Sequence, residues 1–268
     1  MLDALVGQGW EWAVIGAAGV LAGLINGVVG SGTLISFPLL LLLGYPPLVA
    51  NISNNIGLVP GSLSAAMQYR DTLRRDRAFI LKMVPLTIIG SLAGGLLLIA
   101  LPSSVFDAVV PILIAAALGI VVLQPIIQPR MNRRLEATIG TSAGMPTRLK
   151  LTLPLIIALP LLGAYGGYFG AAQGILLLVV FGLVLGLPFG EVNGFKCLLS
   201  ALANAVSGIL YIMVGSQYID WLAVICIAVG STIGGALGGR AAKFLPQGVY
   251  RAVIVVVGLA ALWVTLAR

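Results

Sequence analysis

The chain has 268 residues, of which 60% are hydrophobic and only 9% are charged. Soluble chains carry about 25% charged residues, so this composition excludes a water-soluble domain and indicates an integral membrane protein. The absence of histidine excludes histidine-based proton relays and histidine-ligated metal sites. The two cysteines, Cys197 and Cys226, lie in apolar runs without metal-ligand spacing, so we expect no metal and no cofactor.

Apolar stretches follow one another along the whole chain. A crossing takes about 20 residues, and eight stretches are long enough. They cover residues 12–29, 48–69, 79–100, 105–127, 150–171, 191–214, 220–240 and 248–267. The shorter stretches 32–45 and 174–187 are expected to be half-helices or short helices, and Pro38 and Pro60 are expected to kink or interrupt their helices. The sequence therefore predicts an all-α polytopic membrane protein.

The basic residues gather at three places between these stretches. They are Arg70, Arg74, Arg75, Arg77 and Lys82 at the first, Arg130, Arg133, Arg134, Arg148 and Lys150 in the central linker, and Arg240, Lys243 and Arg251 at the last. The positive-inside rule places all three in the cytoplasm. Junctions 101–107 and 215–220 carry only acidic charge and should face outward. The net charge of +7 is thus a topology signal, and no nucleic-acid partner is expected.

The two halves of the chain resemble each other at a nearly constant offset. A shift of 142 superimposes Gly32, Gly44, Pro46, Asn51 and Tyr69 on Gly174, Gly186, Pro188, Asn193 and Tyr211. GSLAGG at 90–95 likewise matches GSTIGG at 230–235. The sequence therefore predicts two repeats, 1–128 and 150–268, joined by a basic cytoplasmic linker at 129–149.

Equivalent junctions of the two repeats differ in charge. Junction 70–77 is basic and its counterpart 215–220 is not, while 240–251 is basic and 101–107 is acidic. Equivalent junctions should therefore lie on opposite sides of the membrane, which makes the repeats antiparallel, with about five helical segments each. Inverted repeats with short broken helices near the midplane are a recurring plan of secondary transporters.

Three segments carry a family resemblance. They are GLINGVVGSGTLISFPLLLLLGYPP at 23–47, VANISNNIGLVPGSLSAAMQYR at 49–70 and GAYGGYFGAAQGILLLVVFGLVLGLP at 163–188. These segments resemble the TauE/SafE family of sulfite and organosulfur anion exporters, and the resemblance covers essentially the whole chain. It implies a transporter of small sulfur oxyanions in the inner membrane of a bacterium. Many members have Thr-Ser where this chain has Ser53-Asn54 and Phe195-Lys196. The resemblance therefore does not imply which particular anion is carried.

Polar side chains form one stripe in each of the stretches 48–69 and 191–214. Steps of 3 or 4 residues keep the second stripe on one helical face: Lys196, Ser200, Asn204, Ser207 and Tyr211. Asn54, Ser62 and Tyr69 occupy the matching positions of the first repeat. The paired stripes predict a polar surface that faces something other than lipid. The alternative for any single serine is a role in holding helices together.

Lys196 is the only one of the 15 basic residues that lies well away from a charged junction. An ammonium inside a membrane protein is usually paired or lines a wet cavity. We expect Lys196 to bind an anion near the midplane, where its charge offsets the dehydration of the ion. The alternatives are an ion pair with Glu191, five residues earlier, or snorkelling to the interface.

The two breaks before the short stretches supply the other expected anion ligands. Glycine permits a turn, and free N–H groups at a helix start bind anions. The two helix starts could point at one another across the midplane. Together with the stripes, they give an expected binding site of Lys196, Asn54, Asn51, Asn193, Ser53, Ser200, Asn204, Gly30, Ser31, Gly32, Gln173, Gly174 and Tyr168.

The sequence favours a secondary transporter that exports a small anion by alternating access. Glu191 is the one carboxylate expected near the cavity and so the candidate for proton coupling. An intramembrane enzyme would need a nucleophile–base pair or a metal cluster, and the chain offers neither, so no enzymatic activity is expected. The alternatives are a carrier or importer of another small anion and a membrane assembly subunit without transport activity.

Overall fold

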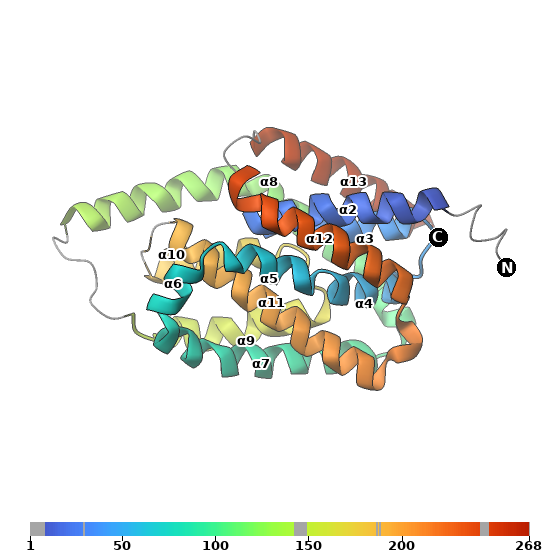
Figure 1. Ribbon diagram of the computed structural model, residues 1–268, viewed down its shortest axis with the longest axis horizontal. Helices are drawn as coiled ribbons and strands as arrows, with labels where there is room; N and C mark the ends of the chain where they lie inside the picture. The colour runs from blue at the N-terminus through green and yellow to red at the C-terminus, as the bar shows by residue number, and fades with distance from the viewer. Residues whose placement is uncertain are drawn as a thin grey trace.

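The computed structural model describes residues 9–28, 30–141, 149–185, 187, 189–241 and 247–267, and all regular structure within them is helical. The first half contains α2 (Gly9–Val28), α3 (Thr33–Leu42), α4 (Pro47–Gly57), α5 (Val59–Met67), α6 (Arg70–Arg75), α7 (Arg77–Ala100) and α8 (Ser103–Thr141). The second half contains α9 (Leu153–Tyr168), α10 (Gln173–Leu185), α11 (Phe189–Val214), the 3-10 turn η1 (Ser216–Tyr218), α12 (Trp221–Ala241) and α13 (Gln247–Ala267). Most of the helices lie roughly along the long axis of the molecule (Figure 1).

Five of the described helices are long and apolar enough to cross a membrane. They are Gly9–Val28, Arg77–Ala100, Ser103–Leu123, Glu191–Val214 and Trp221–Gly238. Large apolar side chains lie on the outside of the molecule, among them Met213 and Trp263, which are 77% and 75% exposed. Such a surface suits hydrocarbon rather than water. The predicted class, an all-α polytopic membrane protein, is confirmed.

The number of long spans differs from the eight expected. The stretch 48–69 is not one helix, because α4 ends at Gly57 and α5 restarts at Val59 with Pro60 in its first turn. Proline has no N–H for the helical ladder and fits best in a first turn, so Pro60 interrupts the span as expected. Pro38, in contrast, lies inside the continuous helix α3. The helices α9 and α10 have only 16 and 13 residues.

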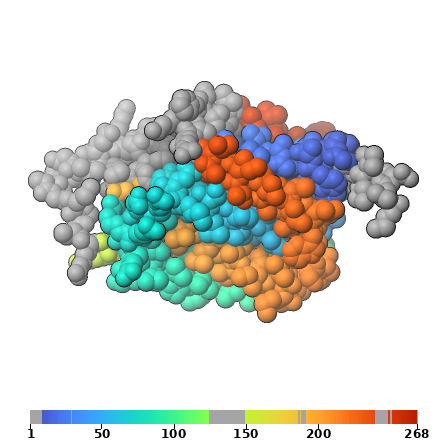
Figure 2. Space-filling view, in the orientation of Figure 1, coloured from blue at the N-terminus to red at the C-terminus, as the bar shows by residue number. Residues whose placement is uncertain are grey.

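The closest helix packing joins the two halves of the chain. Helix α12 packs along α2, and α7 packs along α9. Glycine makes this contact possible: a Cβ on Gly163 would lie 2.8 Å from the carbonyl oxygen of Thr87, and one on Gly19 would lie 3.0 Å from that of Ile227. Small residues at such positions are the usual device for close helix packing in membranes. Figure 2 shows the outcome on one face, where segments from the first and second halves of the chain lie side by side.

Candidate functional site

The breaks between α2 and α3 and between α9 and α10 lie against each other. Gly30 and Gly170 adopt positive φ angles of 87° and 76°, which turn the chain at each break. The backbone N–H of Gly174 donates a hydrogen bond of 3.1 Å to the carbonyl oxygen of Gly30. A Cβ on Gly30 would lie 2.5 Å from the Cα of Gly174, so only glycine fits at this crossing. The two breaks thus form one contact in the interior.

The carboxyl end of α2 is bound by side chains of α11. The Nζ of Lys196 donates to the carbonyl oxygen of Asn26 over 2.6 Å, and the Nδ2 of Asn193 donates to that of Gly27 over 2.8 Å. The last carbonyls of a helix have no partner within the helix and carry partial negative charge. An ammonium group and an amide N–H are therefore well suited to this end.

The carboxyl end of α9 is bound in a parallel way, but by neutral groups. The Nδ2 of Asn51 donates to the carbonyl oxygen of Tyr168 over 3.0 Å, and the Nδ2 of Asn55 donates to that of Gly166 over 3.5 Å. The hydroxyl of Tyr211 donates to the carbonyl oxygen of Gly167. The carboxyl ends of α2 and α9 are therefore both bound by polar side chains of α4 and α11.

Lys196 is fully buried at this crossing, with 0% of its surface exposed. Its Cδ would lie 2.8 Å from a Cβ placed on Gly30, so its aliphatic chain runs past the break of the other half. The side chain therefore does not reach the surface of the molecule, as snorkelling would require. Its Nζ is bound to Asn26, and Glu191, expected as an alternative partner, is bound elsewhere.

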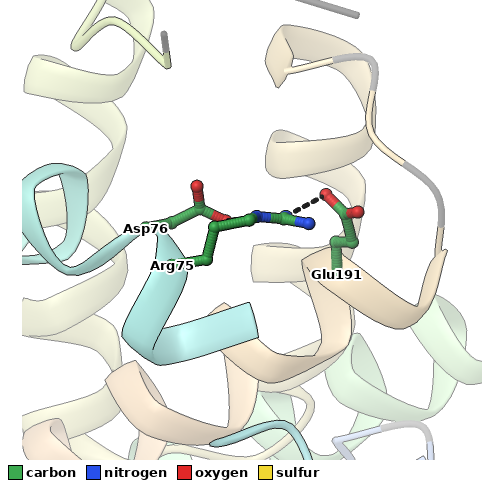
Figure 3. Close-up of polar contacts among 3 residues, drawn as sticks. All are labelled: Arg75, Asp76 and Glu191. Carbon is green, nitrogen blue, oxygen red and sulfur yellow. Dashed lines mark hydrogen bonds and ion pairs between the residues drawn. The ribbon is translucent and has the colours of Figure 1, made fainter. Parts of the chain in front are cut away.

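Glu191 lies at the basic junction instead. Its carboxylate accepts from the guanidinium of Arg75 over 2.9 Å, and Arg75 also binds Asp76 over 2.8 Å (Figure 3). The hydrogen bonds that Arg75 donates, first to Asp76 and second to Glu191, raise the pKa of its guanidinium above the ordinary value, so Arg75 keeps its positive charge. Arg75 thereby ties the corner between α6 and α7 to the first turn of α11.

The other expected residues of the first half differ in their hydrogen-bond partners. Asn54 is buried and accepts a hydrogen bond from Ser36 of α3, while Ser53 accepts one of 2.9 Å from the backbone N–H of Asp220. Ser53 therefore binds the junction that precedes α12. Ser31, between Gly30 and Gly32, is buried at the first break itself.

In the second half, three expected residues are packed close to the second break. Asn204 accepts from the Nδ2 of Asn55 over 3.5 Å, and the Nε2 of Gln173 donates to the carbonyl oxygen of Leu162 over 2.9 Å. The ring of Tyr168 packs edge-on against Phe106 at 5.7 Å. Ser200, one turn after Lys196, is buried on the same face of α11.

Four buried polar atoms among these residues have no hydrogen-bond partner in the described part of the chain. They are the Oγ atoms of Ser31 and Ser200 and the Oδ1 atoms of Asn51 and Asn193. An unpaired buried polar atom costs about 1–3 kcal/mol, so such a group calls for an explanation. All four belong to the breaks or to the stripes beside them.

Sequence reasoning missed Ser36 of α3. It is buried, and its hydroxyl binds both Asn54 and the carbonyl oxygen of Gly32. The available signal was a serine one turn after Gly32, in an otherwise apolar short helix. Asn55 was also absent from the expected site, although it contacts both Asn204 and Ser207.

Comparison with known proteins agrees with this architecture. Residues 15–264 match the family described as sulfite exporter TauE/SafE. The chain belongs to the TauE/SafE family. A probable membrane transporter protein of Haemophilus influenzae is 28% identical over 231 residues, which cover 85% of this chain and 84% of that protein. No solved structure matches the chain.

Two further relatives of this TauE/SafE chain carry similar names. The probable membrane transporter protein YfcA of Escherichia coli K12 is 27% identical over 241 residues, covering 89% of this chain and 83% of that protein. The probable membrane transporter protein ORF9 of a Sinorhizobium species is 25% identical over 251 residues, covering 92% and 89%. The chain is therefore a multi-pass membrane transporter, and the predicted location in the inner membrane of a bacterium fits these findings.

Proposed function

We propose that this transporter exports a small anion, namely sulfite, a sulfonate or a related sulfur oxyanion, by alternating access. The observation that carries the proposal is the complete burial of Lys196 where the two broken helices meet. Ionisable residues inside a membrane protein mark substrate or ion pathways by default. At about 4 Å and an effective dielectric near 20, a fixed cation attracts an anion by about 4 kcal/mol, which selects its sign without trapping it.

The neighbours of Lys196 support an anion site. The hydroxyls of Ser31 and Ser200 are buried and have no partner among the residues that the structure describes, and each can donate to an oxyanion. Helices α3 and α10 begin at the breaks, and their amino ends carry partial positive charge. Sulfite and sulfonates present several oxygens to such donors at once.

Access to the site requires movement, because Lys196 is closed off from every surface. We propose that the halves 1–128 and 150–268 act as inverted repeats that rock against each other and expose the crossing alternately to the two sides. The parallel binding of the ends of α2 and α9 supports this symmetry. A potential of 100 mV, inside negative, drives each anionic charge outward by about 2.3 kcal/mol. Glu191 stays the candidate for proton coupling, and its pair with Arg75 would have to open for that role.

Sulfite efflux from proteoliposomes under an imposed potential tests this proposal. We expect efflux that follows the potential in the wild type and falls at least about tenfold in Lys196→Gln. Lys82→Gln, which neutralises an exposed lysine of α7, is the matched control and should leave efflux unchanged. Lys196→Arg keeps the charge and should retain more efflux than Lys196→Gln.

Because Lys196 also binds the end of α2, stability must be measured beside efflux. Efflux that falls only in proportion to the loss of folded protein would assign Lys196 to packing alone. Equal efflux in the wild type and a folded Lys196→Gln variant would remove Lys196 from the site. Absence of sulfite and sulfonate efflux from folded wild-type protein would refute this substrate class.

A further inference from the structure

A groove opens on the surface beside α6, away from the crossing. It lies between α5, α6 and α7, with Leu198 of α11 also contributing to its lining, and its volume is about 490 Å³. Its walls include Leu63, Met67 and Leu81, which are 41%, 70% and 67% exposed. Three arginines, Arg70, Arg74 and Arg77, also line it, almost entirely with the carbon atoms of their side chains. Figure 1 shows α6 joining the ends of α5 and α7 at one end of the bundle.

The three arginines have little to neutralise them. Arg70 lies 3.8 Å from Asp71, but these side chains are 72% and 90% exposed, and such a pair contributes little. Within the described residues, Arg74 and Arg77 form no ion pair. The neighbouring Arg75 points elsewhere and is bound by Asp76 and Glu191 (Figure 3). These arginines therefore leave uncompensated positive charge beside an apolar groove.

The arrangement of charge and apolar surface follows the profile of a membrane leaflet. Arg77 is the first residue of the span α7, and Leu81 lies one turn further along it. In a bilayer that α7 crosses from Arg77 onward, the arginines would lie level with the polar headgroups and the apolar wall at the depth of the acyl chains. A free anion would use the arginines alone, whereas a phospholipid uses both parts.

We propose that this groove binds an anionic glycerophospholipid of the cytoplasmic leaflet. The phosphate contacts Arg70, Arg74 and Arg77, and an acyl chain lies along Leu63, Met67 and Leu81. Basic pockets between membrane helices on the cytoplasmic side are suited to such headgroups. The bound lipid would brace α6 against α5 and α7, and through the Arg75–Glu191 pair it would support the start of α11.

Native mass spectrometry of the detergent-purified full chain tests the proposal. The protein is exposed to equal amounts of phosphatidylglycerol and phosphatidylcholine, which differ in headgroup charge. We expect preferential retention of phosphatidylglycerol, and a loss of about fivefold or more in Arg74→Gln/Arg77→Gln. Lys150→Gln, which removes an exposed charge outside the groove, should behave as the wild type.

Two outcomes would overturn the lipid site. One is equal retention of the two lipids, or retention of phosphatidylglycerol that is unchanged in the double variant. The other is displacement of the lipid by millimolar inorganic phosphate, which would show a site for a free anion. Arg74→Lys/Arg77→Lys guards against a folding artefact, because it keeps the charge and should retain most of the phosphatidylglycerol. This test does not involve Lys196 or sulfite, so its result is independent of the proposed transport activity.

Discussion

The carboxyl ends of α2 and α9 are both bound by polar side chains, but these side chains differ in charge. Neutral side chains, including Asn51 and Tyr211, bind the end of α9. The end of α2 is bound by Asn193, which aligns with Asn51 at the shift of 142, and in addition by the ammonium group of Lys196. The residue that aligns with Lys196 is Asn54, which is bonded to Ser36 instead.

Under the proposed function, this difference separates side chains that hold the helices from the one that binds substrate. Residues that the two halves share, such as the aligned asparagines, hold the broken helices in place. Lys196 departs from its counterpart, and a buried charge is costly to maintain. In the proposed transport site, this cation gives the crossing a preference for anions that two neutral halves would lack.

The largest expected effect comes from breaking what the two ends share, the glycine crossing. Gly30→Ala would place a Cβ 2.5 Å from the Cα of Gly174, at a φ of 87° that disfavours any side chain. Neither backbone can yield, so we expect a loss of about 3 kcal/mol or more and little folded protein. Thermal unfolding in detergent, followed by size-exclusion chromatography, measures this.

Gly44→Ala is the matched control for that substitution. Gly44 has a similar φ of 91°, but nothing lies within 4 Å of its Cβ position. Only the backbone strain of about 1–2 kcal/mol should remain. If the two variants unfolded at the same temperature, the contact between the breaks would have no energetic importance.

A medium effect is expected from removing the aligned asparagines one at a time. Asn51→Ala deletes one hydrogen bond to a helix end, whereas Asn193→Ala deletes bonds to both Gly27 and Tyr69. Hydrogen bonds between membrane helices contribute about 0.6 kcal/mol on average and at most about 1.7. We expect Asn193→Ala to lower the unfolding temperature more than Asn51→Ala.

Sulfite efflux should separate these two variants further than stability does. Asn193 binds the same helix end as Lys196, so its loss should reduce efflux several-fold, and loss of Asn51 should reduce it less. Equal efflux defects in the two variants would mean that both ends contribute alike, against a special role for the charged one.

The smallest effect is expected at the junction that holds α11. Arg75→Gln removes the ion pair with Glu191. The side chain of Arg75 is 54% exposed and that of Glu191 is 19% exposed. Exposed pairs contribute about 0.2–1 kcal/mol, so stability should change by less than about 1 kcal/mol. A double-mutant cycle with Glu191→Gln in low and high salt measures the coupling, which should shrink as salt is added. A coupling above about 2 kcal/mol would contradict a surface role for this pair.

The fold class could be predicted well because the lengths of the apolar stretches and the positions of the charged residues are visible in the sequence itself. The polar face of α11 was also predictable, since Lys196, Ser200 and Asn204 follow helical spacing and are all buried. The break at Leu58 was signalled by Pro60. Each of these features depends on residues close together in the sequence.

The partners across the site could not be read in this way. Nothing local indicates that Lys196 binds the carbonyl of Asn26, 170 residues earlier, or that Glu191 binds Arg75. Backbone carbonyls look alike in every sequence, so a side chain that binds one leaves no pattern. Which helices cross, and at which turn, depends on packing across the whole chain.

The pairing of α2 with α12 and of α7 with α9 has a consequence for how the protein is made. A ribosome delivers α2 to the membrane well before α12, the helix that covers its glycine face. Until then, small residues such as Gly19 and Gly23 face lipid or a helper protein. Insertion of the first half into the bilayer must therefore precede its final packing against the second half.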